Sequence, residues 1–200
     1  MNKGNILFCG VGGQGIILAS EITAMALIKA GFDVKKSEVH GMAQRGGAVV
    51  ANMRFGEKVF SPLVEPGSAD IEVAFELLES LRYLPYLYRD SKVIVNTQKI
   101  LPLSVATGLE EYPSNIIDEL RERVSYVYPI DAFDLARSVG EVRAANMVLV
   151  GALSRFLPVS REDFLMVIEQ RVPKRFIEAN IKAFLKGAES INYEEVLYKS

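Results

Sequence analysis

The sequence is poor in the residues that build metal centres and disulfides, with one cysteine, Cys9, and one histidine, His40, in 200 positions. A single cysteine excludes an internal disulfide and any multi-cysteine metal or iron–sulfur site made by this chain alone. The first apolar run is short and broken by glycines, so it is neither a secretory signal nor a membrane span. A net charge of −2 gives no reason to expect a nucleic-acid partner. These absences predict a soluble cytoplasmic protein without a metal site of its own and without a membrane partner.

Half of the residues are hydrophobic, which is enough for a sizeable core in a single domain spanning residues 1–200. The pattern predicts an α/β core over about residues 1–140 and a helical part over about 141–200. An apolar strand at 5–9, a glycine turn, a helix at 14–30 ended by Gly31 and a strand at 33–39 form a βαβ unit, which favours a mostly parallel, Rossmann-like three-layer sheet flanked by helices. Further strands are expected at 48–55, 59–60, 69–75, 92–96 and 125–130, and helices at 77–88, 116–123, from 131, at 143–156, after Ser160 and after Pro173.

The glycine turn at residues 10–15 reads Gly-Val-Gly-Gly-Gln-Gly. The spacing Gly-x-Gly-x-x-Gly between a strand and a helix lets a phosphate approach backbone amides at a helix N-terminus. Glu38 is the candidate acidic residue for a ribose hydroxyl. The alternative is a tight turn that only lets the helix pack on the strand, and the sequence leaves the two open. The candidate phosphate-binding residues are Gly10, Gly12, Gly13, Gln14 and Gly15.

A second unusual stretch, residues 37–47, reads Ser-Glu-Val-His-Gly-Met-Ala-Gln-Arg-Gly-Gly. Its glycines and polar groups indicate a shaped functional loop. His40 is a candidate hydrogen-bond donor or proton carrier, although a hydrogen-bonded structural histidine is the simpler interpretation. Arg45 suits a carboxylate or phosphate, and equally a salt bridge across a subunit interface.

Other polar residues have simpler interpretations. Glu76, Glu79 and Arg82 have helical spacing and are expected to form a solvated ion-pair face. Cys9 is expected to be a small buried hydrophobe, and Asn146 stands among apolar residues without an identifiable partner. No Ser–His–Asp order or zinc-ligand spacing is visible. Because no complete catalytic set is present, a subunit or binding role is as good an interpretation as a self-sufficient enzyme.

The two glycine-containing motifs, together with Asn146-Met147 leading to Gly151-Ala152-Leu153, resemble the gamma-type domain of 2-oxoacid:ferredoxin oxidoreductases. The resemblance extends over nearly the whole chain, through residues 180–187. The eleven-residue stretch at 37–47 is similar to the form found in the indolepyruvate branch of that family.

The resemblance implies a subunit for the oxidative decarboxylation of a 2-oxoacid, with coenzyme A taking the acyl group and ferredoxin taking the electrons. Thiamine diphosphate and [4Fe-4S] clusters are then expected in a larger alpha subunit, and this chain completes the active site and the coenzyme A path. A stand-alone NAD(P)-dependent oxidoreductase and a non-catalytic nucleotide-binding or assembly module are the alternatives. His40, Gln44 and Arg45 are the catalytic candidates, and the residues expected to face the partner's active site, the substrate or coenzyme A are Glu38, His40, Gly41, Met42, Gln44, Arg45, Gly46 and Gly47.

Overall fold

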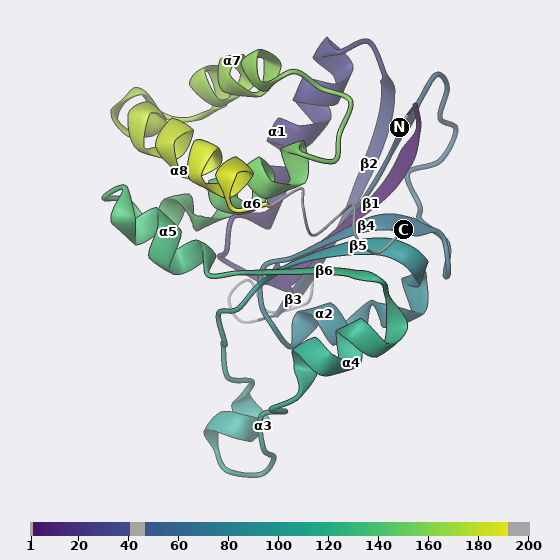
Figure 1. The fold of residues 1–200 in the computed structure, drawn as a ribbon, viewed down its shortest axis with the longest axis vertical. Coiled ribbons are helices and arrows are strands. Elements are labelled where there is room, and N and C mark those ends of the chain that lie inside the picture. The colour runs from purple at the N-terminus through teal and green to yellow at the C-terminus, as the bar shows by residue number, and fades with distance from the viewer. Residues whose placement is uncertain (1, 41–46, 192–200) are drawn as a thin grey trace.

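The computed structural model describes residues 2–40 and 47–191, the side chain of His40 excepted. Within these ranges one six-stranded sheet forms the centre of the molecule, in the order β2-β3-β1-β4-β5-β6 (Figure 1). The strands are β1 (Gly4–Val11), β2 (Asp33–His40), β3 (Ala48–Gly56), β4 (Ala69–Ala74), β5 (Leu87–Asn96) and β6 (Tyr126–Ile130).

The sheet is mainly parallel, as predicted, but its order differs from a simple βαβ unit. β1, β4, β5 and β6 are parallel neighbours. β3 pairs antiparallel with both β1 and β2, so it lies between the two strands that helix α1 connects. The predicted βαβ connection is therefore present in direction, while its two strands are not adjacent. The local sequence pattern does not show that β3 inserts between them, because strand pairing depends on residues far apart in the sequence.

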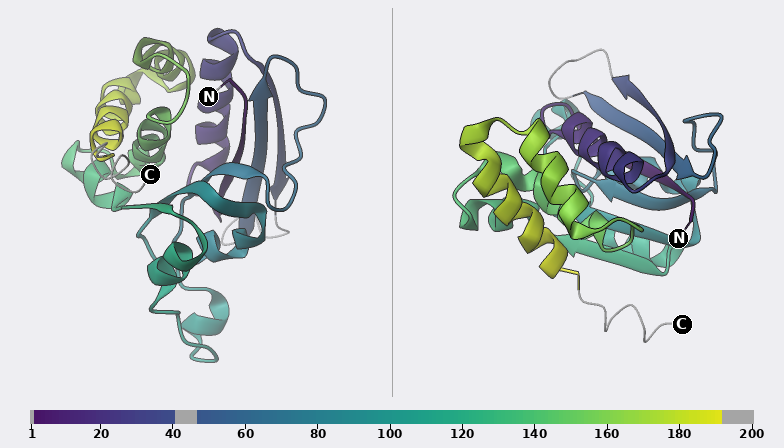
Figure 2. Two further views of the ribbon diagram at one scale, coloured as in Figure 1. Left: turned by 45° about the vertical axis from the view of Figure 1, so that its right-hand side comes forward. Right: turned by 90° about the horizontal axis from the view of Figure 1, so that it is seen from above.

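Helices cover the two faces of the sheet in separate groups. α1 and the C-terminal helices α6, α7 and α8 lie on one side, and α2 and α4 lie on the other (Figure 1, Figure 2). The α-helices are α1 (Ile16–Lys29), α2 (Glu79–Arg82), α3 (Leu103–Ala106), α4 (Ile116–Arg123), α5 (Ala132–Ser138), α6 (Ala145–Ser154), α7 (Arg161–Arg171) and α8 (Ile177–Glu189), and short 3₁₀ turns occupy Leu84–Tyr86, Val142–Ala144 and Lys174–Phe176.

Alternation along β1 divides the core between these two layers. Ile6 and Phe8 belong to the large cluster beneath α1 and α6, whereas Cys9 belongs to the cluster beneath α2 and α4. Successive side chains of a strand point to opposite faces, so a strand covered on both faces is apolar at every position. Cys9 is fully buried, in agreement with its interpretation as a small hydrophobe.

Local signals in the sequence predicted most helix ends correctly. Gly31 has a φ of +94° and follows the last turn of α1, as predicted. Asp131 caps α5 by accepting the N–H of Asp134 at 2.8 Å. Ser160 caps α7 by accepting the N–H of Asp163 at 3.1 Å. The side-chain oxygen in each cap satisfies a backbone donor that has no partner inside its helix.

Helices α6 and α8 cross at backbone contact through Gly151 and Gly187. A Cβ atom on Gly151 would overlap the carbonyl oxygen of Phe184, and one on Gly187 would overlap the carbonyl oxygen of Val148. Both glycines are therefore required by the close approach of the two helices and not by a turn. This crossing packs α8 directly against α6.

Two predicted elements were wrong. The segment 77–88 was predicted as a helix that Pro85 ends or kinks, but it forms only α2 and a 3₁₀ turn before β5 begins at Leu87. Pro85 lies in this segment, and proline breaks the hydrogen bond of a continuing helix. Residues 59–60 form no strand, because the Val59 N–H donates to the Asp33 carboxylate at 2.9 Å.

In the ranges that the structure describes, no helix combines the length and the apolar character that crossing a bilayer requires.

Candidate functional site

A cavity of about 400 Å³ lies at the carboxyl edge of the parallel strands. Open α/β sheets bind ligands at this edge, because the loops that follow the strands converge there. The walls come from the glycine turn after β1, the ends of β4 and β5, and the first residues of α5 and α6. The polar lining residues are Gly13, Gln14, Gly15, Asn96, Gln98, Arg143 and Asn146, and the apolar ones are Leu18, Phe75, Ile100, Phe133, Val142, Ala145 and Leu149.

The side chain of Gln14 folds back onto the glycine turn. Its Oε1 accepts the N–H of Val11 at 2.8 Å, and its Nε2 donates to the carbonyl of Phe75 at 2.7 Å. The N–H of Gln14 itself donates to the Val11 carbonyl at 3.3 Å. Among the described residues, the N–H groups of Gly13 and Gly15 have no acceptor. Because the N–H groups of Gly12 and Gln14 already have backbone acceptors, fewer amides of the turn are free to bind an anion than its glycine spacing alone indicates.

Asn146, which had no identifiable partner in the sequence, packs against the glycine turn. Its Nδ2 donates to the carbonyl of Gly15 at 3.3 Å, across 131 positions of sequence. Gly15 has a φ of +77°, and a Cβ there would lie 2.5 Å from the Asn146 Nδ2. The position requires glycine for its conformation and for this contact. The Oδ1 of Asn146 is buried and has no hydrogen-bond partner within the described ranges.

Asn96 connects the ends of three parallel strands. Its Nδ2 donates to the Phe75 carbonyl after β4 at 3.0 Å, and its Oδ1 accepts the N–H of Ala132 after β6 at 3.2 Å. The Oε1 of Gln98 lies 3.4 Å from the side-chain nitrogens of both Asn96 and Gln14. Amide side chains, rather than charged ones, thus hold the floor of the cavity.

The two motifs singled out in the sequence meet in space. The N–H of Gly12 in the glycine turn donates to the carbonyl of Gly47 at 2.9 Å. This bond brings the end of the 37–47 stretch to the carboxyl edge of the sheet. Glu38, at the start of that stretch, forms an ion pair with Lys36, which also donates to Ser20 of α1 at 3.3 Å.

Several predicted residues lie outside the ranges that the structure describes. The structure does not describe residues 41–46, which include Gly41, Met42, Gln44, Arg45 and Gly46. The side chain of His40, at the end of β2, is likewise not described. Their predicted roles therefore stay predictions.

The expected solvated face of Glu76, Glu79 and Arg82 was wrong, because both carboxylates are buried. Glu79 binds the Arg82 guanidinium through two hydrogen bonds of 3.0 Å. Glu76 accepts the Glu79 N–H at 2.9 Å, the Ile100 N–H at 3.0 Å and the Tyr112 hydroxyl at 2.7 Å. Helical spacing suggested a surface stripe, but α2 is only one turn long, and the Glu76 carboxylate before it turns inward to accept two backbone N–H groups.

Glu72 is a third buried carboxyl, which the sequence interpretation missed. It lies in β4, and its Oε1 accepts the thiol of Cys9 at 3.2 Å. Its Oε2 is buried and has no hydrogen-bond partner in the described part of the chain. Burial raises the pKa of the Glu72 carboxyl to about 8, and burial followed by the nearby Glu72 raises the pKa of the Cys9 thiol. The available signal was an acidic residue between the apolar residues Ile71 and Val73 of the strand at residues 69–75.

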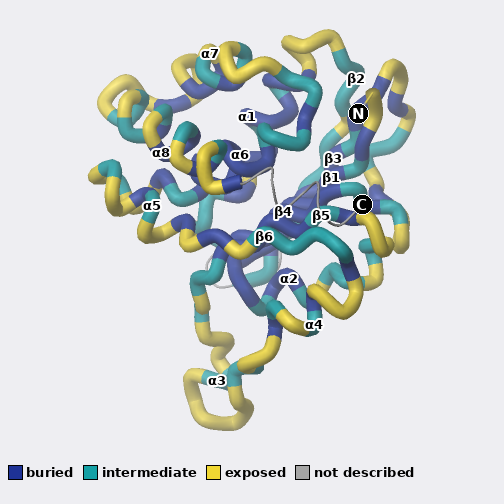
Figure 3. The backbone as a smooth tube through the Cα atoms, in the orientation of Figure 1, coloured by how far each residue is buried: buried dark blue, intermediate teal, exposed yellow. Residues whose placement is uncertain are grey.

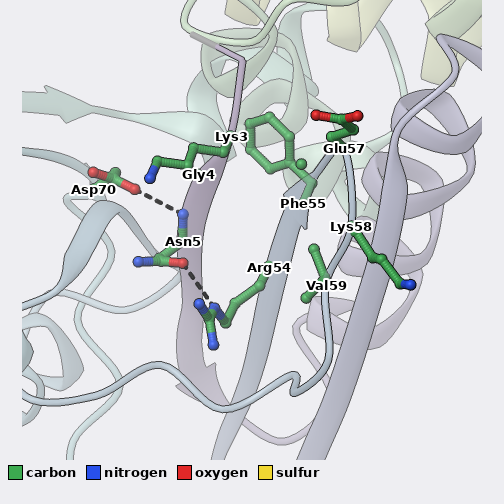
Figure 4. A pocket seen from close by; sticks show the side chains of 10 residues that line it. Lys3, Gly4, Asn5, Arg54, Phe55, Glu57, Lys58, Val59 and Asp70 are labelled. Atoms are coloured by element: carbon green, nitrogen blue, oxygen red, sulfur yellow. Dashed lines mark hydrogen bonds between the residues drawn. The ribbon is translucent and has the colours of Figure 1, made fainter.

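A second cavity, of about 460 Å³, lies at the opposite edge of the sheet (Figure 4). Asn5 connects its walls: the side-chain Oδ1 accepts the Arg54 Nε–H at 3.0 Å, and the backbone N–H donates to Asp70 at 2.8 Å. Lys3, Lys58 and Glu57 line the remainder. Charges of both signs are mixed here, so the cavity favours no single class of ligand.

Across the described residues, no group of three or more His, Cys, Asp or Glu side chains is arranged to hold a metal ion. The one cysteine of the chain is buried beside Glu72. A [4Fe–4S] cluster needs several cysteine thiolates, so the residues of this chain do not fit one.

Comparison with known proteins identifies the family. Residues 5–190 match the family model described as pyruvate ferredoxin/flavodoxin oxidoreductase. The chain belongs to this oxidoreductase family. It is 40% identical to the indolepyruvate oxidoreductase subunit IorB of Thermococcus kodakarensis over 197 residues, which cover 95% of this chain and 96% of that protein. The IorB of Archaeoglobus fulgidus is 41% identical over 187 residues, or 92% of each chain.

A solved relative has the same fold. The gamma subunit of a keto/oxoacid ferredoxin oxidoreductase from Geobacter sulfurreducens aligns with a TM-score of 0.69 and 27% identity, over 94% of this chain and 97% of that one. Members of the oxidoreductase family similar to this chain are thus named as subunits, which implies a partner subunit. The predicted family and its mainly parallel α/β fold are confirmed, and no comparison supports the alternative of a stand-alone NAD(P)-dependent enzyme.

Proposed function

We propose that this chain is the smaller subunit of an indolepyruvate ferredoxin oxidoreductase that acts on aryl pyruvates. The reaction is the coenzyme A-dependent oxidative decarboxylation of a 2-oxoacid to an acyl-CoA, with electrons passed to ferredoxin. The observation that carries the proposal is the 40% identity to indolepyruvate oxidoreductase subunit IorB over 95% of the chain. Similarity of this extent supports a shared role more strongly than the fold alone does.

The proposal divides the chemistry between two subunits. Thiamine diphosphate and [4Fe–4S] clusters belong to the larger alpha subunit, where they supply the decarboxylation and electron-transfer chemistry. This assignment is supported by the presence of a single cysteine in the sequence. Coenzyme A is a cosubstrate, and ferredoxin receives its electrons through the complex. The present chain completes the active site and the coenzyme A path.

The 37–47 stretch is the part of this chain that we assign to the partner's active site. His40 and Gln44 supply hydrogen bonds, and Arg45 supplies positive charge for the substrate carboxylate or the coenzyme A phosphates. The hydrogen bond between Gly12 and Gly47 supports this assignment, because it holds one end of the stretch beside the carboxyl-edge cavity. Glu38, Gly41, Met42 and Gly46 complete the contact surface in this proposal.

The assignment is tested in the assembled complex with the variants His40→Ala and Arg45→Ala. Each is expected to assemble normally and to lose at least about tenfold in kcat/KM for aryl pyruvate or coenzyme A, because a charged hydrogen bond is worth about 1.5–3 kcal/mol. Arg121→Ala on α4, whose side chain is 58% exposed, is the matched control and should keep full activity. Full coenzyme A-dependent turnover in both loop variants would remove the assignment.

The subunit role itself is tested by anaerobic affinity purification of the full chain from its native cells. A larger subunit that carries bound thiamine diphosphate and cysteine-rich cluster motifs is the expected companion. Its mixture with this chain should oxidise indolepyruvate only in the presence of coenzyme A and an electron acceptor. Recovery of the chain alone, in a form that binds NADH, would contradict the proposed function.

A further inference from the structure

An arm between β5 and α4 projects from the body of the molecule (Figure 1, Figure 3). It comprises residues 98–112, includes helix α3, and is called the leucine arm below. Leu101, Leu103 and Leu109 are 54%, 80% and 81% exposed. Single exposed leucines are common, but three on one projecting element favour an interaction site.

The tip of the leucine arm is folded by its own polar groups. The carbonyl of Ser104 accepts the N–H of Leu109 at 2.8 Å and that of Glu110 at 3.2 Å. The Ser104 hydroxyl donates to the Glu110 carboxylate at 2.7 Å, and the Thr107 hydroxyl donates to the Leu103 carbonyl at 2.8 Å. The tip therefore has a defined shape while its leucines stay in water.

The base of the arm is held by Glu76, which is buried. One oxygen of this carboxylate accepts the Ile100 N–H at 3.0 Å from the outgoing limb and the Tyr112 hydroxyl at 2.7 Å from the returning limb. The Leu77 N–H also donates to the Gln98 carbonyl at 3.1 Å. Both limbs are thus tied to one point, so a protein that binds the tip loses little entropy in ordering the arm.

The outgoing limb starts at the rim of the carboxyl-edge cavity. Gln98 and Ile100 line that cavity, and Leu101 follows directly. The exposed leucines of the arm therefore begin one residue beyond the lining of the candidate site. A protein that covers this edge of the cavity therefore meets the start of the arm.

We propose that the leucine arm docks into an apolar groove of the larger subunit and anchors it over the carboxyl-edge cavity. This inference rests on the proposed function, because that function supplies the larger subunit. Leu103 and Leu109 are the anchors, and Glu76 with Tyr112 positions them. Burial of the two leucines supplies affinity, and the preformed arm sets the orientation of the partner.

The test measures the affinity between the full chain and the larger subunit recovered with it, by biolayer interferometry under anaerobic conditions. The variant Leu103→Glu/Leu109→Glu is expected to bind at least about a hundredfold more weakly, since burial of one leucine contributes about tenfold or more. Leu63→Glu is the matched control, because Leu63 is 58% exposed in the segment between β3 and β4, and its affinity should stay within twofold. The circular dichroism spectrum and melting temperature of each free variant establish that it is folded.

The outcomes separate this inference from the proposed function. If a larger subunit with thiamine diphosphate binds the double variant as tightly as the unmodified chain, the arm proposal fails and the proposed function stands. An equal loss in the Leu63→Glu control would also overturn the arm proposal. If the double variant instead only converts a dimer of the chain to a monomer in sedimentation, the occupant is a second copy and the proposal is wrong. Absence of any larger subunit would sink both.

Discussion

The buried carboxyl of Glu72 gives a quantitative prediction about stability and pH. The group is fully buried in β4, and its pKa is about 8 in the folded protein against an ordinary value of 4.5. Between these two pH values the unfolded chain has lost the proton that the folded chain keeps. Stability contributed by this group is therefore fully present below pH 4.5 and is lost as the pH rises toward 8.

The magnitude follows from the difference in pKa. A shift of one unit corresponds to about 1.4 kcal/mol, so ionisation of Glu72 disfavours the folded state by about 3 kcal/mol at pH 7 and by about 5 kcal/mol above pH 8. Glu72→Gln keeps a carbonyl oxygen that accepts the Cys9 thiol, and it cannot ionise. Its buried NH₂ group carries two unpaired N–H donors where the protonated carboxyl carries one unpaired O–H, so the variant starts about 1–3 kcal/mol less stable at pH 4.5.

The assay is urea denaturation of the full chain at half-unit steps from pH 4.5 to 8. We expect the free energy of unfolding of Glu72→Gln, relative to that of the unmodified chain, to rise by about 3 kcal/mol between pH 4.5 and pH 7. Glu65→Gln, at an exposed glutamate, should follow the unmodified curve throughout. Parallel curves for Glu72→Gln and the unmodified chain over the whole range would refute the assignment of this pH dependence to Glu72.

Three further substitutions test the contacts that shape the site and its surroundings. Gly15→Ala is expected to lower the free energy of unfolding by at least about 2 kcal/mol, because a Cβ there meets Asn146 in a backbone conformation that alanine disfavours. Thermal denaturation measures this loss. If the double variant Gly15→Ala/Asn146→Gly recovers no part of it, the clash with Asn146 is not its cause. Gly151→Ala should cost at least about 3 kcal/mol by forcing α6 and α8 apart, whereas Ala145→Gly in α6 should cost only about 1 kcal/mol, and equal urea midpoints would contradict the close crossing. Tyr112→Phe removes a hydroxyl that both donates to Glu76 and accepts from a backbone N–H, so a loss of about 1–3 kcal/mol is expected; an unchanged urea midpoint would show that the base of the arm is held by other contacts.

Local signals in the sequence determined the first strand, the helix that follows it and most helix ends. The apolar run of β1, the glycines that follow it and the apolar helix α1 lie next to one another in the chain, so their spacing carries the structural information. The helix start at Asp131 and the cap at Ser160 were predicted for the same reason, since a cap bonds to a backbone group only three positions away. The resemblance of residues 10–15 and 37–47 to a known family also required only the sequence.

Only the tertiary structure decided how distant segments share groups. The insertion of β3 between β1 and β2, the contact of Asn146 with Gly15 and the bond from Gly12 to Gly47 all join segments that local periodicity treats separately.

The environment of the acidic residues was also decided only by the tertiary structure. From spacing alone, Glu76 and Glu79 resemble a solvated helix face, and the sequence does not indicate that the Glu72 carboxyl contacts the Cys9 thiol. Whether a carboxyl is solvated or buried depends on what the rest of the chain packs against it, and that packing also sets its pKa and the anchoring of the leucine arm.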